Sequence, residues 1–360
     1  MPTKNELIEK AHKSVKRANR LLTRARGEVP PPVIPPLKPP QLLIAYANLA
    51  NPMSANTIPA ELMPWAIGMG ATPNTWLYAS RLYKPPGQMS TQPELRDDFE
   101  DIIVQALDDG YSDDIVITDI EATAGRVMRG WETTFEDGIK REPTSAEVDA
   151  VAETFYGIEK VCLVNGVKEI GHYGFPSTNW QNSDVDDIVA HFNHIGFNGN
   201  DPWRLMCPSI YDLYSEDYGD TAAQDQLGQD RTRKRLEASL KLVGGDPYRV
   251  VPVIWQRLHH WDRPSFRAML SDGEFLRDQI HICTDLGITR FCLWGKPTRV
   301  IEQGTTSAYV ETDSPGIYEP ALKFMGGHDV PMNDEQINEW LGEVYPKHVI
   351  ELLLTELGLN

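Results

Sequence analysis

The sequence predicts an α/β fold: a barrel of seven or eight parallel strands, preceded by an N-terminal helix and a proline-rich linker. First, short β-like runs alternate with longer helical patterns from residue 41 onward, as in repeated βα units. Second, such units over about 260 residues fit a TIM-like barrel better than an open doubly wound sheet. Third, the first predicted strand is not followed by Gly-x-Gly-x-x-Gly, and no Gly-x-x-x-x-Gly-Lys occurs, which disfavours nucleotide binding.

The predicted elements follow one another in a regular order. Strands are expected over residues 42–47, 75–82, 115–121, 168–175, 204–211, 249–256 and 289–294. Helices are expected over residues 144–164, 184–195, 222–243 and 272–286, with a C-terminal helix over residues 333–357. Thr144 follows a proline and stands three residues before Glu147, which is the pattern of a capping box at a helix N-terminus.

The N-terminal segment differs from the rest of the chain. Residues 4–26 contain neither Pro nor Gly and predict a helix with a short a/d heptad pattern of apolar residues. These residues are Ile8, Ala11, Val15, Ala18, Leu22 and Ala25. The helix is interpreted either as a solvated tail or as a segment that oligomerises the chain or docks it onto a larger assembly. A membrane-surface helix is disfavoured because the apolar seam is narrow and rich in alanine.

A proline-rich stretch separates this helix from the barrel. Seven prolines among residues 30–40 predict a stiff, extended spacer. The chain is therefore divided into a basic helix over residues 1–28, a linker over residues 29–40 and a barrel with a C-terminal helix over residues 41–360. Such a tethered design would suit an enzyme displayed on a phage tail or virion, although a free enzyme can carry such a tail too.

Composition excludes several classes of function. Hydrophobic residues make up 41% and charged residues 24% of the 360 residues, which excludes global disorder. No apolar run approaches the roughly 20 residues of a membrane helix, and the N-terminus lacks the apolar core of a secretory signal. We therefore expect no membrane partner and leave the localisation open.

The net charge and the cysteine content indicate which partners and cofactors are not expected. The net charge is −18, but residues 1–40 carry +6, so the remaining chain carries −24. Such an acidic body repels phosphates, and nucleic acid is not an expected partner. The four cysteines show no metal-ligand spacing, and we expect neither a metal nor a cofactor.

The most informative stretch is a run of β-branched residues that ends in two acids. Asp119 and Glu121 interrupt this strand at its C-terminal end, and the period of two places both on the face of Ile115 and Ile117. The carboxyl ends of barrel strands are where catalytic residues lie. Two carboxylates so close repel, so one should keep its proton through a raised pKa, as a general acid must. The alternatives are a metal site completed elsewhere and a pair of solvated loop acids.

Aromatic residues stand at four other predicted strand ends. Tyr173 and Phe175 are expected on one face of their strand, and Tyr211 on the face of its own strand that holds Cys207 and Ser209. Aromatic faces and phenolic hydroxyls in a cleft suit sugar rings. The residues expected to contact such a substrate are Tyr173, Phe175, Tyr211, Trp255, Gln256 and Trp294.

Four motifs together resemble one enzyme family. In chain order they are Asp119-x-Glu121, Gly-His-Tyr173-Gly-Phe-Pro, Pro208-Ser-Ile-Tyr211 and Leu293-Trp294-Gly295. Their order and spacing over roughly residues 42–300 resemble those of the hyaluronidase-type glycoside hydrolases. The resemblance implies an irregular TIM-like barrel, with Glu121 as general acid/base and Asp119 as the carboxylate that orients the substrate's acetamido group. It also implies that Tyr173, Tyr211 and Trp294 line the site.

The implied reaction is substrate-assisted hydrolysis of an N-acetylhexosamine polysaccharide, in which the acetamido oxygen replaces a protein nucleophile. The sequence departs from the family pattern at Ile120, where the family has Trp, and lacks the Trp-Arg-Pro that follows there. An acidic body is an awkward host for the anionic polymer hyaluronan, unless a basic groove overrides it. The arginines near predicted strand ends are Arg126, Arg129, Arg257 and Arg263.

Two other functions remain open. A peptidoglycan hydrolase, either a muramidase or a glucosaminidase, would also place Asp-x-Glu at a strand end. A carbohydrate-binding barrel without turnover would keep the aromatic cleft but would not need Asp119 and Glu121 together. The polymer, its linkage, the endo or exo mode and the oligomeric state are left open.

Overall fold

The computed structural model describes residues 39–46, 62–84, 94–110, 112, 114–120, 123–135, 138–177, 184–210, 222–255, 273–294 and 345–359. The predicted N-terminal helix and almost all of the predicted linker lie outside these residues, and so do Glu121, Tyr211 and Gln256. The division into helix, linker and barrel therefore stays a prediction.

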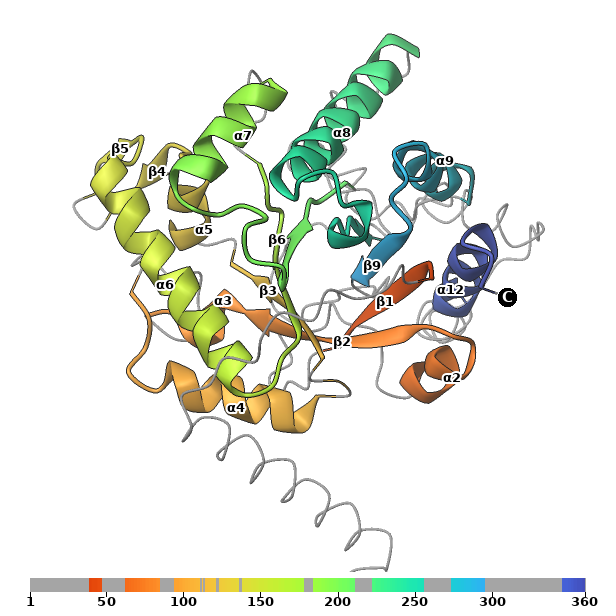
Figure 1. Cartoon of the computed structure of the whole chain (residues 1–360), viewed down its shortest axis with the longest axis horizontal. Helices are drawn as coiled ribbons and strands as arrows, with labels where there is room; N and C mark the ends of the chain where they lie inside the picture. Colours follow the sequence, from red (N-terminus) through yellow and green to blue (C-terminus); the bar gives the residue numbers. More distant parts are fainter. Residues whose placement is uncertain are drawn as a thin grey trace, which may run out of the picture.

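The described residues form a sheet of seven strands, all paired in parallel. The strands are β1 (Gln41–Tyr46), β2 (Thr72–Tyr78), β3 (Ile115–Asp119), β6 (Glu169–Tyr173), β7 (Arg204–Cys207), β8 (Val253–Trp255) and β9 (Arg290–Trp294). Their order is β7-β6-β3-β2-β1-β9-β8. Isolated parallel bridges also link the two ends of this order, from Met206 of β7 to Val250 just before β8 and from Ser209 just after β7 to Val253 of β8. The sheet thus curls into a nearly closed barrel with helices around it, which confirms the predicted TIM-like α/β barrel (Figure 1).

All seven predicted strands are present, although several are shorter than predicted. The second strand begins at Thr72 and ends at Tyr78, because the chain then turns into the short helix α3 (Ala79–Leu82). The strand β7, the fifth barrel strand in chain order, ends at Cys207. Pro208 follows it and has no N–H to continue the ladder of hydrogen bonds.

The predicted helices pack outside the barrel. They are α6 (Ser145–Val164), α7 (Val185–His194), α8 (Ala222–Leu242), α9 (Gly273–Thr284) and α12 (Tyr345–Glu356). The capping box is present: the Glu147 N–H donates to Thr144 Oγ1 at 3.3 Å, and the Thr144 N–H donates to Glu147 Oε2 at 2.8 Å. The C-terminal helix is described only from Tyr345, so its predicted start near residue 333 is untested.

Several short elements were not predicted. Besides α3, they include the helices α2 (Met63–Gly68), α4 (Phe99–Asp109) and α5 (Thr123–Met128), and the hairpin of β4 (Thr133–Thr134) and β5 (Lys140–Arg141). The helix α4 lies between β2 and β3, where it supplies the crossover that parallel neighbours require.

The buried apolar residues form two clusters, one on each side of the barrel wall. The outer cluster fills the space between strands and helices and contains Val116 and Ile120. The inner cluster fills the barrel and contains Ile115 and Ile117. This confirms the two faces predicted for β3 and makes the barrel interior a packed core.

A buried ion pair closes the amino end of the barrel. Arg290 is fully buried, and its Nη2 lies 2.7 Å from Glu169 Oε2. Its Nε donates to Gln41 Oε1 at 3.1 Å, and its Nη1 donates to the Tyr248 carbonyl at 2.8 Å. Because these three acceptors satisfy the guanidinium, a charge can occupy the apolar interior at this end.

Candidate functional site

The candidate site lies inside the barrel at the carboxyl ends of its strands, where β/α barrels carry their reactive groups. Three neighbouring strands contribute one acidic and three aromatic residues there. These are Trp76 and Tyr78 of β2, Asp119 of β3 and Tyr173 of β6. Trp294 of β9 completes the group. The pairing of β2 with β3 sets Tyr78 beside Asp119.

Asp119 is the last residue of β3 and is almost completely buried. Its Oδ2 accepts a hydrogen bond from Trp76 Nε1 at 3.4 Å. The placement inside the barrel follows from the strand period, since Ile115 and Ile117 precede it on the same face. Glu121 lies outside the described residues, so the predicted pairing of the two carboxylates and its raised pKa stay predictions.

Three aromatic rings pack against one another beneath the site. The ring centroids of Trp76 and Trp294 lie 6.0 Å apart at 26°, and those of Tyr173 and Trp294 lie 6.0 Å apart at 25°. Trp76 and Tyr173 are 5.9 Å apart, so each ring contacts the other two. Trp294 Nε1 also donates to the Tyr78 hydroxyl at 3.3 Å. The structure thus brings together Asp119, Tyr173 and Trp294, three of the residues predicted from the sequence.

Trp76 and Tyr78 were not singled out from the sequence. Both alternate with outward residues at the C-terminal end of β2, which is the signal that identified Tyr173 and Trp294. The predicted strand extended to residue 82 and so hid this signal, because it placed the strand end four residues too late.

The predicted position of Phe175 is wrong. Tyr173 faces the barrel interior, whereas Phe175 belongs to the outer cluster and packs on Phe155 at 5.5 Å and Phe192 at 5.6 Å. The alternation stops because β6 ends at Tyr173 and Gly174 adopts a φ of 75°, a left-handed conformation. Phe175 therefore supports the wall of the barrel and does not line its interior.

Arg129 does not supply a basic groove. The residue is buried, with its Nη2 donating to the Tyr173 carbonyl at 3.0 Å and its guanidinium 4.7 Å from the centre of the Phe175 ring. It therefore holds the end of β6 from outside. Arg126 is exposed on α5, and Arg257 and Arg263 lie outside the described residues.

The remaining predicted contacts belong to the strands predicted over residues 204–211 and 249–256. Trp255 ends β8, where its backbone pairs with that of Trp294, and Tyr211 and Gln256 are outside the described residues. Ser209 is buried just beyond β7, and its hydroxyl makes no hydrogen bond to the residues that the structure describes. The sequence analysis used Ser209 only to place Tyr211 and gave its hydroxyl no role.

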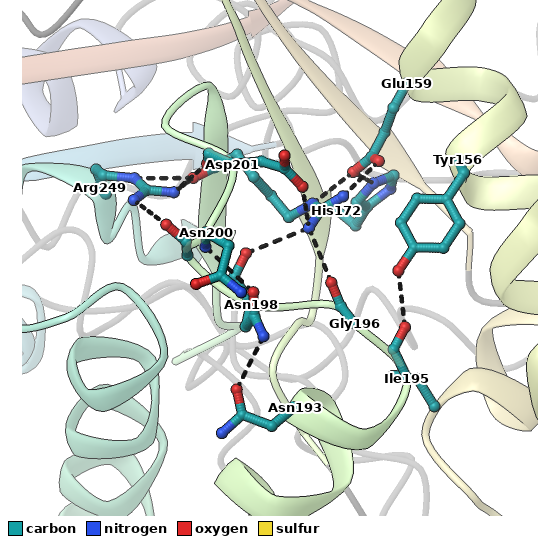
Figure 2. Close-up of polar contacts among 12 residues, drawn as sticks. Tyr156, Glu159, His172, Asn193, Ile195, Gly196, Asn198, Asn200, Asp201 and Arg249 are labelled. Atoms are coloured by element: carbon teal, nitrogen blue, oxygen red, sulfur yellow. Dashed lines mark hydrogen bonds and ion pairs between the residues drawn. The ribbon is translucent and has the colours of Figure 1, made fainter. Parts of the chain in front are cut away.

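A buried polar network outside the barrel holds β3, β6 and β7 together. Figure 2 shows Glu159 of α6 and His172 of β6 pointing toward each other, with His172 Nε2 3.1 Å from Glu159 Oε1. Arg204 of β7 donates from Nε and Nη2 to the two Glu159 oxygens, each at 2.8 Å. The Thr118 hydroxyl of β3 lies 2.5 Å from His172 Nδ1. Thr118 adjoins Asp119 and His172 adjoins Tyr173, so the network positions the strand ends that carry the site.

The protonation states of this network follow from burial. Burial lowers the pKa of His172 more than its hydrogen bond to Glu159 raises it, so the imidazole is neutral. Burial alone would raise the pKa of Glu159, but the hydrogen bonds from His172 and Arg204 outweigh it and lower that pKa. Since a carboxylate only accepts, His172 Nε2 carries the proton and Nδ1 accepts from Thr118.

The other chemistry available to the described residues is limited. They contain no group of three or more His, Cys, Asp or Glu side chains that could hold a metal ion. All four cysteines are buried, and burial raises the pKa of each thiol, which disfavours a thiolate nucleophile. Within the described parts of the chain, no helix is long and apolar enough to cross a membrane.

Fold and site together define a TIM-like α/β barrel with a buried carboxylate held among aromatic side chains at the carboxyl ends of its strands. No protein-family model matches the chain, and no curated protein matches its sequence.

Proposed function

We propose that the protein is a glycoside hydrolase that cleaves an N-acetylhexosamine-containing polysaccharide by a substrate-assisted, retaining mechanism. The observation that supports this most directly is the buried Asp119 carboxylate at the end of β3, two residues before Glu121. A carboxylate in this place costs solvation energy, which a function at the strand end explains and packing alone does not.

The aromatic residues support a sugar as the ligand. Tyr78 is half-buried at the open end of the group, and its hydroxyl is oriented by the Trp294 indole. Sugar rings present C–H faces that pack on aromatic rings and hydroxyls that need directed hydrogen bonds. Tyr173 and Trp294 stack on each other beneath this end, and their rings would offer an apolar surface to the methyl group of an acetamido substituent.

In the proposed reaction, the acetamido oxygen of the substrate attacks its own anomeric carbon while the glycosidic C–O bond breaks. Glu121 transfers its proton to the leaving oxygen. Asp119 accepts a hydrogen bond from the acetamido N–H and offsets the positive charge of the oxazolinium-like intermediate. Water then attacks the anomeric carbon while the bond from that carbon to the acetamido oxygen breaks. The water gives a proton to Glu121, which restores the acid, and the product keeps the original configuration.

A reducing-end assay tests the proposal. The native protein and the Glu121→Gln variant are incubated with hyaluronan, chondroitin, chitin oligomers, peptidoglycan and bacterial capsules. We expect new reducing ends from at least one N-acetylhexosamine polymer with the native protein and a loss of at least about 100-fold with the variant. Cleavage of peptidoglycan alone would favour the muramidase or glucosaminidase alternative, and binding of a polymer without cleavage would favour a carbohydrate-binding barrel.

A further inference from the structure

We propose that Trp76 is a positioning residue for Asp119, whose carboxylate it holds through its indole N–H. The inference rests on the proposed function, since it assigns the orientation of Asp119 toward the acetamido group to a side chain of the neighbouring strand. Neither residue of this pair lies in an exposed region: Trp76 is 2% and Asp119 is 6% exposed.

The geometry places the donor below the carboxylate. Strands β2 and β3 are neighbours, and their register pairs Trp76 with Ile117 and Tyr78 with Asp119. Trp76 therefore lies one inward position nearer the amino end of the barrel than Asp119. From there its Nε1 reaches Asp119 Oδ2 at 3.4 Å.

The indole is itself held in place. Its ring packs against Trp294 at 6.0 Å and against Tyr173 at 5.9 Å, and these two rings also stack on each other. Rotation of Trp76 away from Asp119 would break both contacts, so the N–H is fixed before a substrate binds. A side chain that orients a reactive carboxylate in this way can matter as much as a direct contact, because a displacement of about 1 Å can cost about 100-fold in rate.

Because Trp76 is buried, its effect on Asp119 can be distinguished from direct contact with a sugar. A ring that is 2% exposed offers no face on which a sugar could stack. Any effect of the indole N–H on turnover should therefore pass through Asp119. This distinguishes Trp76 from Tyr78, which is half-buried and carries a hydroxyl.

The hydrogen bond can be tested without a substrate. The chain contains nine tryptophans, so the indole region of a ¹⁵N–¹H spectrum holds nine signals. The signal that disappears in Trp76→Phe belongs to Trp76, and Trp203→Phe assigns a control indole that packs 4.8 Å from the Arg204 guanidinium outside the barrel. In Asp119→Asn we expect the Trp76 indole proton to move to lower frequency while the Trp203 signal stays in place. An unmoved Trp76 signal would overturn the proposal.

The positioning role is tested by a double-mutant cycle on a substrate from the polysaccharide assay. Trp76→Phe keeps an aromatic ring and removes the N–H, and we expect kcat to fall about 10- to 100-fold with KM changed less than about threefold. In the Asp119→Asn background, Trp76→Phe should change kcat by less than about twofold, because the carboxylate that the indole orients is already lost. Trp203→Phe should retain native turnover.

The outcomes separate this inference from the proposed function. Losses that multiply in the double variant would overturn the positioning role, because Trp76→Phe would then act through packing and not through Asp119. Native turnover in Asp119→Asn would overturn the proposed function at Asp119 and the positioning role with it. The indole signal would still decide separately whether the hydrogen bond exists.

Discussion

Replacement of Glu159 by Gln removes one negative charge from the network behind β3, β6 and β7. The carboxylate accepts three hydrogen bonds: two from Arg204 at 2.8 Å and one from His172 at 3.1 Å. An amide of the same shape has one acceptor oxygen, so its NH₂ group must face a donor of Arg204 or His172. The exposed fractions of the Arg204 and Glu159 side chains are 0% and 1%, so water cannot replace the lost partner.

The size of the stability loss in Glu159→Gln follows from the burial of this ion pair. Removing one partner of a buried ion pair costs about 3–5 kcal/mol, because the other charge is left without compensation. Arg204 keeps the Gly196 and Asn198 carbonyls at 3.2 Å and Asp201 at 3.0 Å, which favours the lower half of the range. We therefore expect Glu159→Gln to lower the free energy of unfolding by about 3 kcal/mol.

Urea unfolding at pH 7, followed by circular dichroism at 222 nm, measures this loss. The matched control is Asp186→Asn, which breaks the ion pair between Lys241 Nζ and Asp186 Oδ1 at 2.8 Å. In this pair the side chain of Asp186 is 84% exposed and that of Lys241 is 54% exposed. The control should lose less than about 1 kcal/mol, because water screens an exposed pair. A loss in Glu159→Gln no larger than in the control would refute the argument that burial makes the network strong.

Three further predictions address the site and the barrel. Glu121→Gln should lower turnover about 100- to 10,000-fold while polysaccharide binding persists, because it removes the transferable proton and keeps the shape; unchanged turnover on a verified substrate would contradict Glu121 as the acid. Because burial lowers the pKa of His172, the unfolded chain binds a proton below about pH 6.5 that the folded chain does not. As the pH is lowered below about 6.5, the free energy of unfolding should therefore decrease, by up to about 1.4 kcal/mol per pH unit. This decrease should be steeper in the native protein than in His172→Gln; equal slopes in the two proteins would contradict the prediction. Gly171→Ala should cost about 1–3 kcal/mol in urea unfolding, because a Cβ there would overlap Cys207 Sγ inside the barrel. Cys207→Ala should recover part of that loss, and no recovery would place the strain elsewhere.

Local patterns in the sequence were enough to predict the seven barrel strands and most of the longer helices. The β-branched run before Asp119 predicts a strand with Ile115 inside and Val116 outside, because side chains alternate in every extended segment whatever its neighbours. Thr144 and Glu147 predict the start of α6 for the same reason, since a capping box is complete within four residues.

Where the chain turns depends on contacts that no short window contains. Phe175 leaves the predicted face because Gly174 takes a positive φ beside the guanidinium of Arg129, a residue 45 positions earlier in the chain. The helices α2 and α5 have only six residues each, which is too short for a clear helical period to show in the sequence.

The local sequence patterns establish that the chain alternates strands with helices and that acidic and aromatic residues stand near predicted strand ends. Which of these strand ends lie side by side follows from the folded arrangement of the strands. This arrangement sets β2 beside β3 and so brings Trp76 to Asp119, 43 residues away, and it links Glu159 to Arg204, 45 residues away. The alternation of side chains is a property of each strand alone, whereas the partner of a side chain depends on the order and register of all the strands that close the barrel.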